Sequence, residues 1–378
     1  MIRIFSLVAA TLFLFACQSE DLPATAEEER PEAVEATVDL EIGVADGEEE
    51  YLFGRIGGVA VSPGGHVVVA DLQAHELRAY DREGTYLFTI GGHGEGPGEL
   101  NRPCCPAFGP DGLLWVRDDQ NRRYNAYDLT DSGASPHDNI RMDHTHFGLL
   151  AAITFDEDGH LIDVGGRQPT EDDESNRGRF HRSMDSETVR EVMIPAAPEG
   201  RIPIYEAPIE GGIMFVPQPM GARELNAHSP TGEWAFTITD RYEVTWFNAA
   251  GDTLRVISQD MAGPELSPDE QERAQQQLQQ QADRIDARVS EFPFGVPDRK
   301  PPLAGIFFDS DGRLWVQRSV PDGAPNEADV YDRDGNLVQV VQWPSGISLT
   351  LGHLTEDTLY GIRQGGGDAF PQVVRLRY

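Results

Sequence analysis

Positive charge is scarce in this sequence of 378 residues. It holds 30 lysines and arginines against 64 aspartates and glutamates, which gives a formal net charge of −34, and Lys300 is the only lysine. Such an excess of acid repels phosphate backbones and anionic lipid headgroups. The composition therefore argues against nucleic acid as a partner.

Cysteine is nearly absent as well. Besides Cys17 there are only the neighbours Cys104 and Cys105, and no histidine lies at the spacing of a recognisable cysteine protease. In an oxidising compartment Cys104 and Cys105 could form a vicinal disulfide that stiffens one loop. Two small buried thiols are the alternative.

The N-terminal apolar run, Ile4–Phe15, is too short to span a membrane comfortably. It follows the basic residue Arg3, so residues 1–16 have the character of a signal peptide. The run ends in Leu14-Phe15-Ala16-Cys17, which resembles the cleavage box of bacterial lipoproteins. The resemblance implies that Cys17 becomes the acylated first residue and anchors the protein to a membrane of the bacterial cell envelope, at the periplasmic face or the cell surface. A secretory signal with an incidental cysteine is the alternative.

The next segment lacks aromatic residues. Residues 17–37 are acidic and rich in proline and alanine, a composition that buries too little apolar surface to fold. We predict a disordered tether here, because charges of one sign keep a linker extended. Residues 38–378 remain for the folded domain.

A repeating pattern fills that domain. Its cleanest copy, Ile56–Gly91, has two apolar strands joined by a Gly64-Gly65 turn, then a polar gap, a strand ending in Tyr80-Asp81-Arg82-Glu83-Gly84, and a final strand. Later copies turn at Asp111-Gly112, Asp158-Gly159, Thr231-Gly232 and Asp311-Gly312, and a degenerate sixth copy ends the chain. Four-strand units that cannot bury their faces alone stack around an axis. The pattern predicts an all-β, six-bladed β-propeller.

The first unit closely resembles an NHL repeat, and the whole domain resembles the six-bladed propeller superfamily that includes TolB-like domains. The likeness is carried by Val59–Asp71, Gly91–Leu100 (GGHGEGPGEL) and Gly305–Val316. It implies a bacterial envelope lipoprotein of propeller fold. It implies no particular activity, because this fold hosts binding proteins and enzymes alike.

The last blade is one strand short, because only Gln372–Tyr378 follows the strand Leu359–Ile362. An early strand near Val38–Ile42 is expected to fill the gap, which joins the two ends of the chain and protects the sheet edges. This N-terminal strand would close the ring.

One helix is predicted as an insertion at residues 267–290. Ser267 and Glu270 match a capping box, and Pro268 suits the first helical position. The apolar stripe of this helix is expected to dock on the propeller. The Pro-rich stretch Pro195–Arg223 is expected to be a long connection between blades.

Arginines recur in the loop that follows the second strand of each blade, and such loops gather on one face of a propeller. Five of the six copies carry one there: Arg117, Arg167, Arg241, Arg318 and Arg363. Asp71 and Asp118 lie at the same position. A guanidinium fork suits carboxylate or phosphate, so we hypothesise a site for an anionic small molecule, peptide or glycan. The alternative is that the arginines pair with acids of neighbouring blades and that the aspartates close their own loops.

A metal site is a further hypothesis. His144 and His146 alternate, so on a strand they would share one face, close to His137, Asp138 and Asp143. An exposed polar edge strand is the alternative. No cofactor is predicted, although a divalent metal remains open.

No catalytic set of residues is recognisable in the sequence. The leading interpretation is therefore a non-enzymatic, lipid-anchored binding or interaction module. The alternative is a metal-dependent propeller hydrolase or lyase, lactonase-like or amidating-lyase-like, which needs several ligands converging on the axis with one open coordination position. A structural partner in an envelope complex, with the Gln-rich helix as its contact, is a third interpretation.

Overall fold

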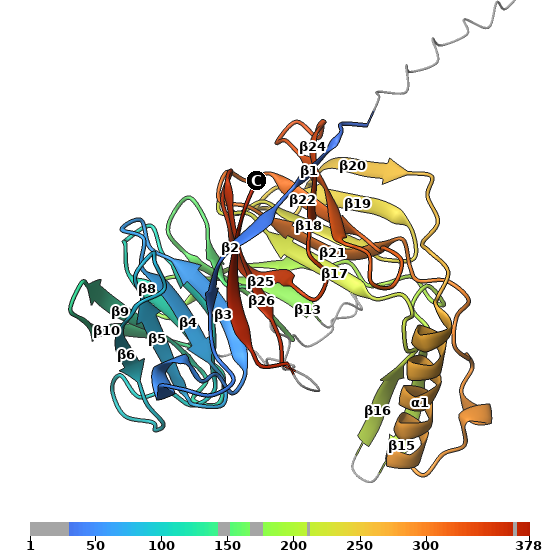
Figure 1. The fold of residues 1–378 in the computed structure, drawn as a ribbon, viewed down its shortest axis with the longest axis horizontal. Helices are drawn as coiled ribbons and strands as arrows, with labels where there is room; N and C mark the ends of the chain where they lie inside the picture. Colours follow the sequence, from blue (N-terminus) through green and yellow to red (C-terminus); the bar gives the residue numbers. More distant parts are fainter. Residues whose placement is uncertain (1–29, 143–151, 167–176, 210–211, 366–368) are drawn as a thin grey trace, which may run out of the picture. The chain divides into compact units, whose positions relative to one another are not determined.

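Short antiparallel strands joined by tight turns build the computed structural model, which describes residues 30–142, 152–166, 177–209, 212–365 and 369–378. Within these residues the strands form six propeller blades and one separate hairpin (Figure 1). Gly112 and Gly312, with φ of +80° and +75°, occupy the turn after the first strand of their blades, where a left-handed residue is needed. The predicted all-β, six-bladed propeller is confirmed.

The first three blades each contain four strands in chain order. Blade 1 consists of β3 (Ile56–Val61), β4 (Val67–Asp71), β5 (Glu76–Tyr80) and β6 (Tyr86–Gly91). Blade 2 consists of β7 (Pro103–Phe108), β8 (Leu114–Asp118), β9 (Arg123–Thr130) and β10 (Gly133–Arg141). Blade 3 consists of β11 (Thr154–Phe155), β12 (Leu161–Gly166), β13 (Arg177–Arg182) and β14 (Thr188–Met193).

The other three blades follow the same order, and the last two also take in strands from the N-terminus. Blade 4 consists of β17 (Glu224–His228), β18 (Trp234–Ile238), β19 (Tyr242–Phe247) and β20 (Thr253–Gln259). Blade 5 contains β21 (Leu303–Phe308), β22 (Leu314–Arg318), β23 (Asn326–Tyr331) and β24 (Leu337–Trp343), and blade 6 contains β25 (Ser348–Leu354), β26 (Thr358–Arg363) and β27 (Gln372–Arg377).

The first strand of each blade lies innermost. Strand β3 contacts β7, β17 contacts β21, and β25 contacts both β21 and β3, so the inner strands succeed one another and the ring closes from blade 6 to blade 1. Trp115, Trp234 and Trp315 are at most 1% exposed and pack between blades. Burial of such large rings dominates the core energetically.

The N-terminal strand closes blade 6. Strand β2 (Thr37–Ile42) pairs antiparallel with β27, with Ile42 opposite Val373 and Val38 opposite Leu376. The predicted closing strand is confirmed. Strand β2 and the last strand of the chain, β27, therefore lie in one sheet (Figure 1).

A second N-terminal strand was not predicted. Strand β1 (Ala33–Glu35) pairs parallel with β24 and makes blade 5 five-stranded. The next residue, Ala36, is 1% exposed and belongs to the core cluster of Trp315 and Trp343. The tether boundary at residue 37 is therefore too late, because the free edge of β24 pairs with a backbone whose side chains carry no strand signal.

The inserted helix α1 (Pro268–Arg284) begins with the predicted capping box. The Ser267 hydroxyl accepts from the backbone N–H of Glu270, and the Glu270 carboxylate accepts from that of Ser267. The helix ends at Arg284, and only a short 3₁₀ turn, η2 (Val289–Glu291), follows it. No helix in the described part of the chain is long and apolar enough to span a membrane.

The apolar stripe of α1 docks on a hairpin and not on a blade. Leu278 and Ala282 are buried with Ala207 and Val216, which belong to β15 (Ile204–Ile209) and β16 (Gly212–Pro217) (Figure 1). The expected connection between blades 3 and 4 thus contains a two-stranded sheet. A two-stranded sheet is marginal alone, and the helix supplies the apolar face that it needs.

Candidate functional site

The first predicted arginine is an inter-blade clamp. Arg117 is fully buried, and its Nε lies 2.7 Å from Oδ2 of Asp163 in blade 3. The Tyr124 hydroxyl donates to the same carboxylate at 2.6 Å. The positive charge of Arg117 is therefore neutralised inside the protein, as the alternative interpretation requires.

The other predicted arginines are also engaged or lie outside the described residues. Arg318 donates to Asp329 at 2.7 Å, and Arg363 donates to Glu41 at 2.9 Å. Arg241 is 66% exposed, with its Nε 3.9 Å from Asp240. Arg167 lies outside the described residues, as do Cys17 and the metal candidates His144 and His146. A binding mouth built from these arginines thus has no support from the described part of the chain.

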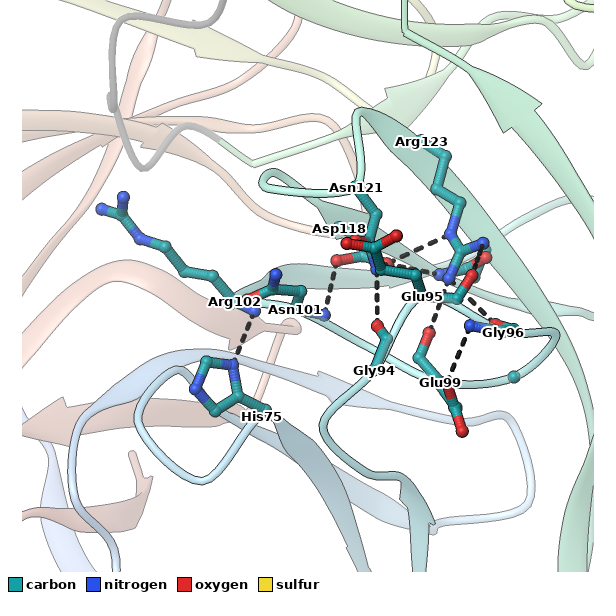
Figure 2. A network of polar contacts seen from close by, with 12 residues as sticks. His75, Gly94, Glu95, Gly96, Glu99, Asn101, Arg102, Asp118, Asn121 and Arg123 are labelled. Atoms are coloured by element: carbon teal, nitrogen blue, oxygen red, sulfur yellow. Dashed lines mark hydrogen bonds and ion pairs between the residues drawn. The ribbon is translucent and has the colours of Figure 1, made fainter.

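The two predicted aspartates close loops. The fully buried Asp71 carboxylate accepts the backbone N–H groups of Gly54, Arg55, Gln73 and Ala74 at 2.9–3.2 Å. Asp118, also fully buried, accepts from the Asn101 backbone, the Asn121 amide and the Arg123 guanidinium (Figure 2). Both carboxylates are saturated by the protein and hold the loops between blades in place.

The glycine-rich loop Gly91–Leu100 is anchored by one guanidinium. Arg123 donates to the carbonyl oxygens of Glu95, Gly96 and Glu99 at 2.8–3.1 Å (Figure 2). Because the carbonyls point at a cation, the loop does not present an anion-binding row of N–H groups here. This agrees with a loop between blades.

Cys104 and Cys105 form a disulfide in the structure. Both are nearly fully buried, and Nη1 of Arg117 lies 3.5 and 3.2 Å from their sulfur atoms. Cys105 has φ of +60°, in the left-handed region. The disulfide therefore packs beside the clamp between blades 2 and 3.

One group of potential metal ligands occurs among the described residues. Asp156, Asp158 and His160 place one ligand atom each within 4.8 Å of one another. However, Oδ1 of Asp156 already accepts the backbone N–H groups of Asp158 and His160, and Oδ2 bonds the ring of His181 at 2.9 Å. The arrangement caps a hairpin turn, as Asp309 does in blade 5.

A cavity of about 220 Å³ lies against the inner strands of blades 4, 5 and 6. Ile306 and Phe308 of β21 and Leu349 of β25 contribute apolar surface. Polar groups come from β17, where Glu224, Asn226 and His228 alternate, and from Arg177 of β13, which pairs with Glu224. We call this site the axial cavity.

A buried cation, Arg179, contacts the His228 side chain of the axial cavity and has no carboxylate partner in the described part of the chain. Arg179 is 0% exposed. Its Nε donates to Nδ1 of His228 at 3.1 Å, and its Nη2 donates to the Gly232 carbonyl at 3.0 Å. Its guanidinium lies 5.0 Å from the Trp234 ring. Burial lowers the pKa of Arg179 to about 9, so it still carries its charge at pH 7.

The tautomer of His228 follows from this contact. Burial and the nearby Arg179 charge lower the pKa of His228 well below its ordinary value, so the ring is neutral. Because Nδ1 accepts from Arg179, the single ring proton must be on Nε2. That buried Nε2 has no hydrogen-bond partner among the described residues, and neither does Oδ1 of Asn226. The axial cavity is thus bordered by one unused donor and one unused acceptor.

These residues were not predicted from the sequence. Site residues were expected in the loops after second strands, whereas Arg177, Arg179 and His181 alternate along the third strand of blade 3 and His228 lies on an inner strand. The available signal was the strand sequence RGRFHR, with four basic residues among six in a strongly acidic chain. Strand β17, which carries His228, begins at residue 224, 42 residues after β13 ends at residue 182, a separation that no local pattern spans.

The chain is a six-bladed β-propeller protein. No protein-family model matches it, and no curated protein does. Among solved structures it resembles a protein from Bacteroides fragilis that is predicted to be exported, with 10% identity, a TM-score of 0.50 and coverage of 90% of this chain and 95% of the other.

Enzymes of propeller fold are also among the similar structures. A gluconolactonase from Xanthomonas campestris shares 13% identity over 86% of this chain and 87% of its own, with a TM-score of 0.41. A virginiamycin B lyase from Staphylococcus aureus shares 12% identity over 90% and 98%, with a TM-score of 0.44. At these identities and TM-scores the two likenesses carry no conclusion about this chain.

Proposed function

We propose that this protein is a non-enzymatic binding module that holds a small anionic ligand in the axial cavity. The observation that carries the proposal is Arg179, a buried guanidinium without a carboxylate partner among the described residues. An unpaired buried charge costs several kcal/mol, and a bound anion would offset that cost. His228 links this charge to the axial cavity, because the Arg179 guanidinium at Nδ1 polarises the imidazole and makes its Nε2–H a stronger hydrogen-bond donor.

The size and lining of the axial cavity narrow the ligand. A volume of about 220 Å³ suits a molecule smaller than a typical drug, and the wall formed by Ile306, Phe308 and Leu349 favours an apolar body. A small carboxylate with an apolar or aromatic tail fits both features.

The tautomer of His228 favours binding over the metal-dependent alternative. A ring nitrogen that carries a proton has no lone pair for a metal, and the other nitrogen is occupied by Arg179. Glu224 is likewise held by Arg177. A lactonase-like or lyase-like centre at this place would need both contacts to be broken.

Titration calorimetry on the full chain tests the proposal, with benzoate as the probe and benzyl alcohol as its uncharged counterpart. We expect benzoate to bind at least tenfold more tightly, and His228→Leu to abolish the difference. Arg241→Gln, an exposed arginine of the same blade, is the control and should bind as the original chain does. Equal binding of the two probes, or stoichiometric calcium or zinc that disappears in His228→Leu, would favour the enzyme alternative.

We further propose that the module is held in the cell envelope by a lipid on Cys17. The proposal rests on the Leu14-Phe15-Ala16-Cys17 box and on the acidic segment that follows it. Several acyl chains would anchor a protein firmly where one would not. Labelling of cells with a clickable palmitate should mark the original chain and spare Cys17→Ser; an unlabelled original chain would exclude lipidation.

A further inference from the structure

A second pocket, of about 390 Å³, opens between blades 1 and 2. The turn after β4 contributes Gln73 and His75, the segment before β7 contributes Asn101 and Arg102, and Gln120 follows β8. Arg55 and the buried Leu72 complete the lining. We call this the blade 1–2 pocket, and it shares no residue with the axial cavity.

The lining of the blade 1–2 pocket is basic in an acidic protein. None of the described residues that line it is an aspartate or glutamate, although the chain has 64 of them. The exposed Arg55 side chain forms no ion pair with a described residue. The Arg102 side chain is 40% exposed, extends away from the polar network of Figure 2, and forms an ion pair with Asp119 at 3.8 Å. The Arg55 guanidinium is therefore available to a ligand, and Arg102 adds a second, partly exposed guanidinium to the pocket.

The third basic residue of the blade 1–2 pocket, His75, can donate a hydrogen bond through Nε2. Its Nδ1 accepts the backbone N–H of Arg102 at 3.0 Å, so in the neutral ring the proton is on Nε2 (Figure 2). His75 and Arg102 have φ of +60° and +68°, a conformation that costs energy for residues other than glycine. The saturated carboxylates of Asp71 and Asp118 hold the adjoining backbone. The pocket is thus fixed before any ligand arrives, which reduces the entropy lost on binding.

The geometry points to an acidic saccharide as the ligand of the blade 1–2 pocket. Two guanidinium forks suit a carboxylate, and the amides of Gln73, Asn101 and Gln120 can both donate and accept, as sugar hydroxyls require. The pocket has no deep apolar recess, since Leu72 is its only aliphatic side chain, which disfavours a peptide side chain. Hydroxyls and one carboxylate on a single ring match this set of donors.

Calorimetry on the full chain with D-glucuronate, D-glucose and inorganic phosphate tests the inference. We expect glucuronate to bind at least tenfold more tightly than glucose, and the double variant Arg55→Gln/Arg102→Gln to remove this preference. Arg241→Gln is the matched control, because it removes an exposed arginine from another blade and should leave glucuronate binding unchanged. A second variant, Gln73→Ala/Gln120→Ala, should weaken glucuronate and leave phosphate unaffected.

Four results would overturn the inference. They are an absence of glucuronate binding, equal affinity for glucose, binding that survives the double arginine variant, and phosphate binding as tight as that of glucuronate. None of these outcomes bears on the axial cavity, because benzoate binding there depends on His228. Melting temperatures of all variants within a few degrees of the original chain exclude unfolding as the cause.

Discussion

Replacement of Arg179 by methionine should stabilise the ligand-free protein. The fall in the pKa of Arg179 from 12.5 to about 9 corresponds to roughly 5 kcal/mol of cost for the charged form, at about 1.4 kcal/mol per pH unit. Against this, the variant loses two hydrogen bonds from a charged donor, to His228 and Gly232, at about 1.5 kcal/mol each, and a ring contact of about 1 kcal/mol. We expect a net gain of about 1 kcal/mol in the free energy of unfolding.

Urea denaturation followed by tryptophan fluorescence at pH 7 measures this gain. The matched control is Arg117→Met, which removes an equally buried guanidinium but leaves the buried Asp163 carboxylate without the cation that neutralises it. That variant should lose about 3–5 kcal/mol. If the free energy of unfolding rises in Arg179→Met and falls in Arg117→Met, Arg117 stabilises the fold, whereas the charge of Arg179 destabilises the ligand-free protein and serves a ligand.

Ligand addition completes the experiment. With benzoate at 100 times its dissociation constant the original chain should gain about 2.7 kcal/mol, and Arg179→Met should gain nothing. A loss of more than about 1 kcal/mol in ligand-free Arg179→Met would refute the reasoning, because it would mean that Arg179 already has its energetic partner inside the fold.

Three further outcomes can be measured on the same protein. Deletion of β2 should lower the free energy of unfolding by at least about 3 kcal/mol, because Ile42 leaves the core and the edge of β27 becomes exposed; unchanged cooperative melting would contradict ring closure by this strand. Burial lowers the pKa of His353 to about 4. Between this pH and about 6.5 the unfolded chain therefore binds a proton at this residue and the folded chain does not. The free energy of unfolding should be full above about pH 6.5 and should fall by roughly 3 kcal/mol as the pH drops to about 4. His353→Phe should flatten that decline, and an unchanged pH slope would show that other groups cause it. Ser267→Ala should cost about 1 kcal/mol through the lost cap of α1, seen as faster amide exchange in the first turn, while Ser310→Ala, outside any cap, should leave exchange in α1 unchanged.

The sequence contained enough local information for the blades, the closing strand and the helix cap. Two-residue turns, period-two apolar strands and the Ser267–Glu270 box each act within a few residues, so a linear reading finds them. The closing strand followed from a count, since a blade with three strands must borrow a fourth. Strand β1 and the β15–β16 hairpin were not predicted, because an edge strand pairs through its backbone and needs no particular side chains.

The partners of charged side chains were decided by the tertiary structure alone. Arg117 and Arg179 are both buried arginines on blade strands, yet one meets Asp163, 46 residues away, and the other meets His228, 49 residues away. Composition and turn signals fix that blades form and how many there are. Which side chains face each other across neighbouring blades depends on strand register and blade packing, and both are set by burial of the whole ring. Only the assembled fold therefore distinguishes an arginine that pairs with a carboxylate from one that has no carboxylate partner among the described residues.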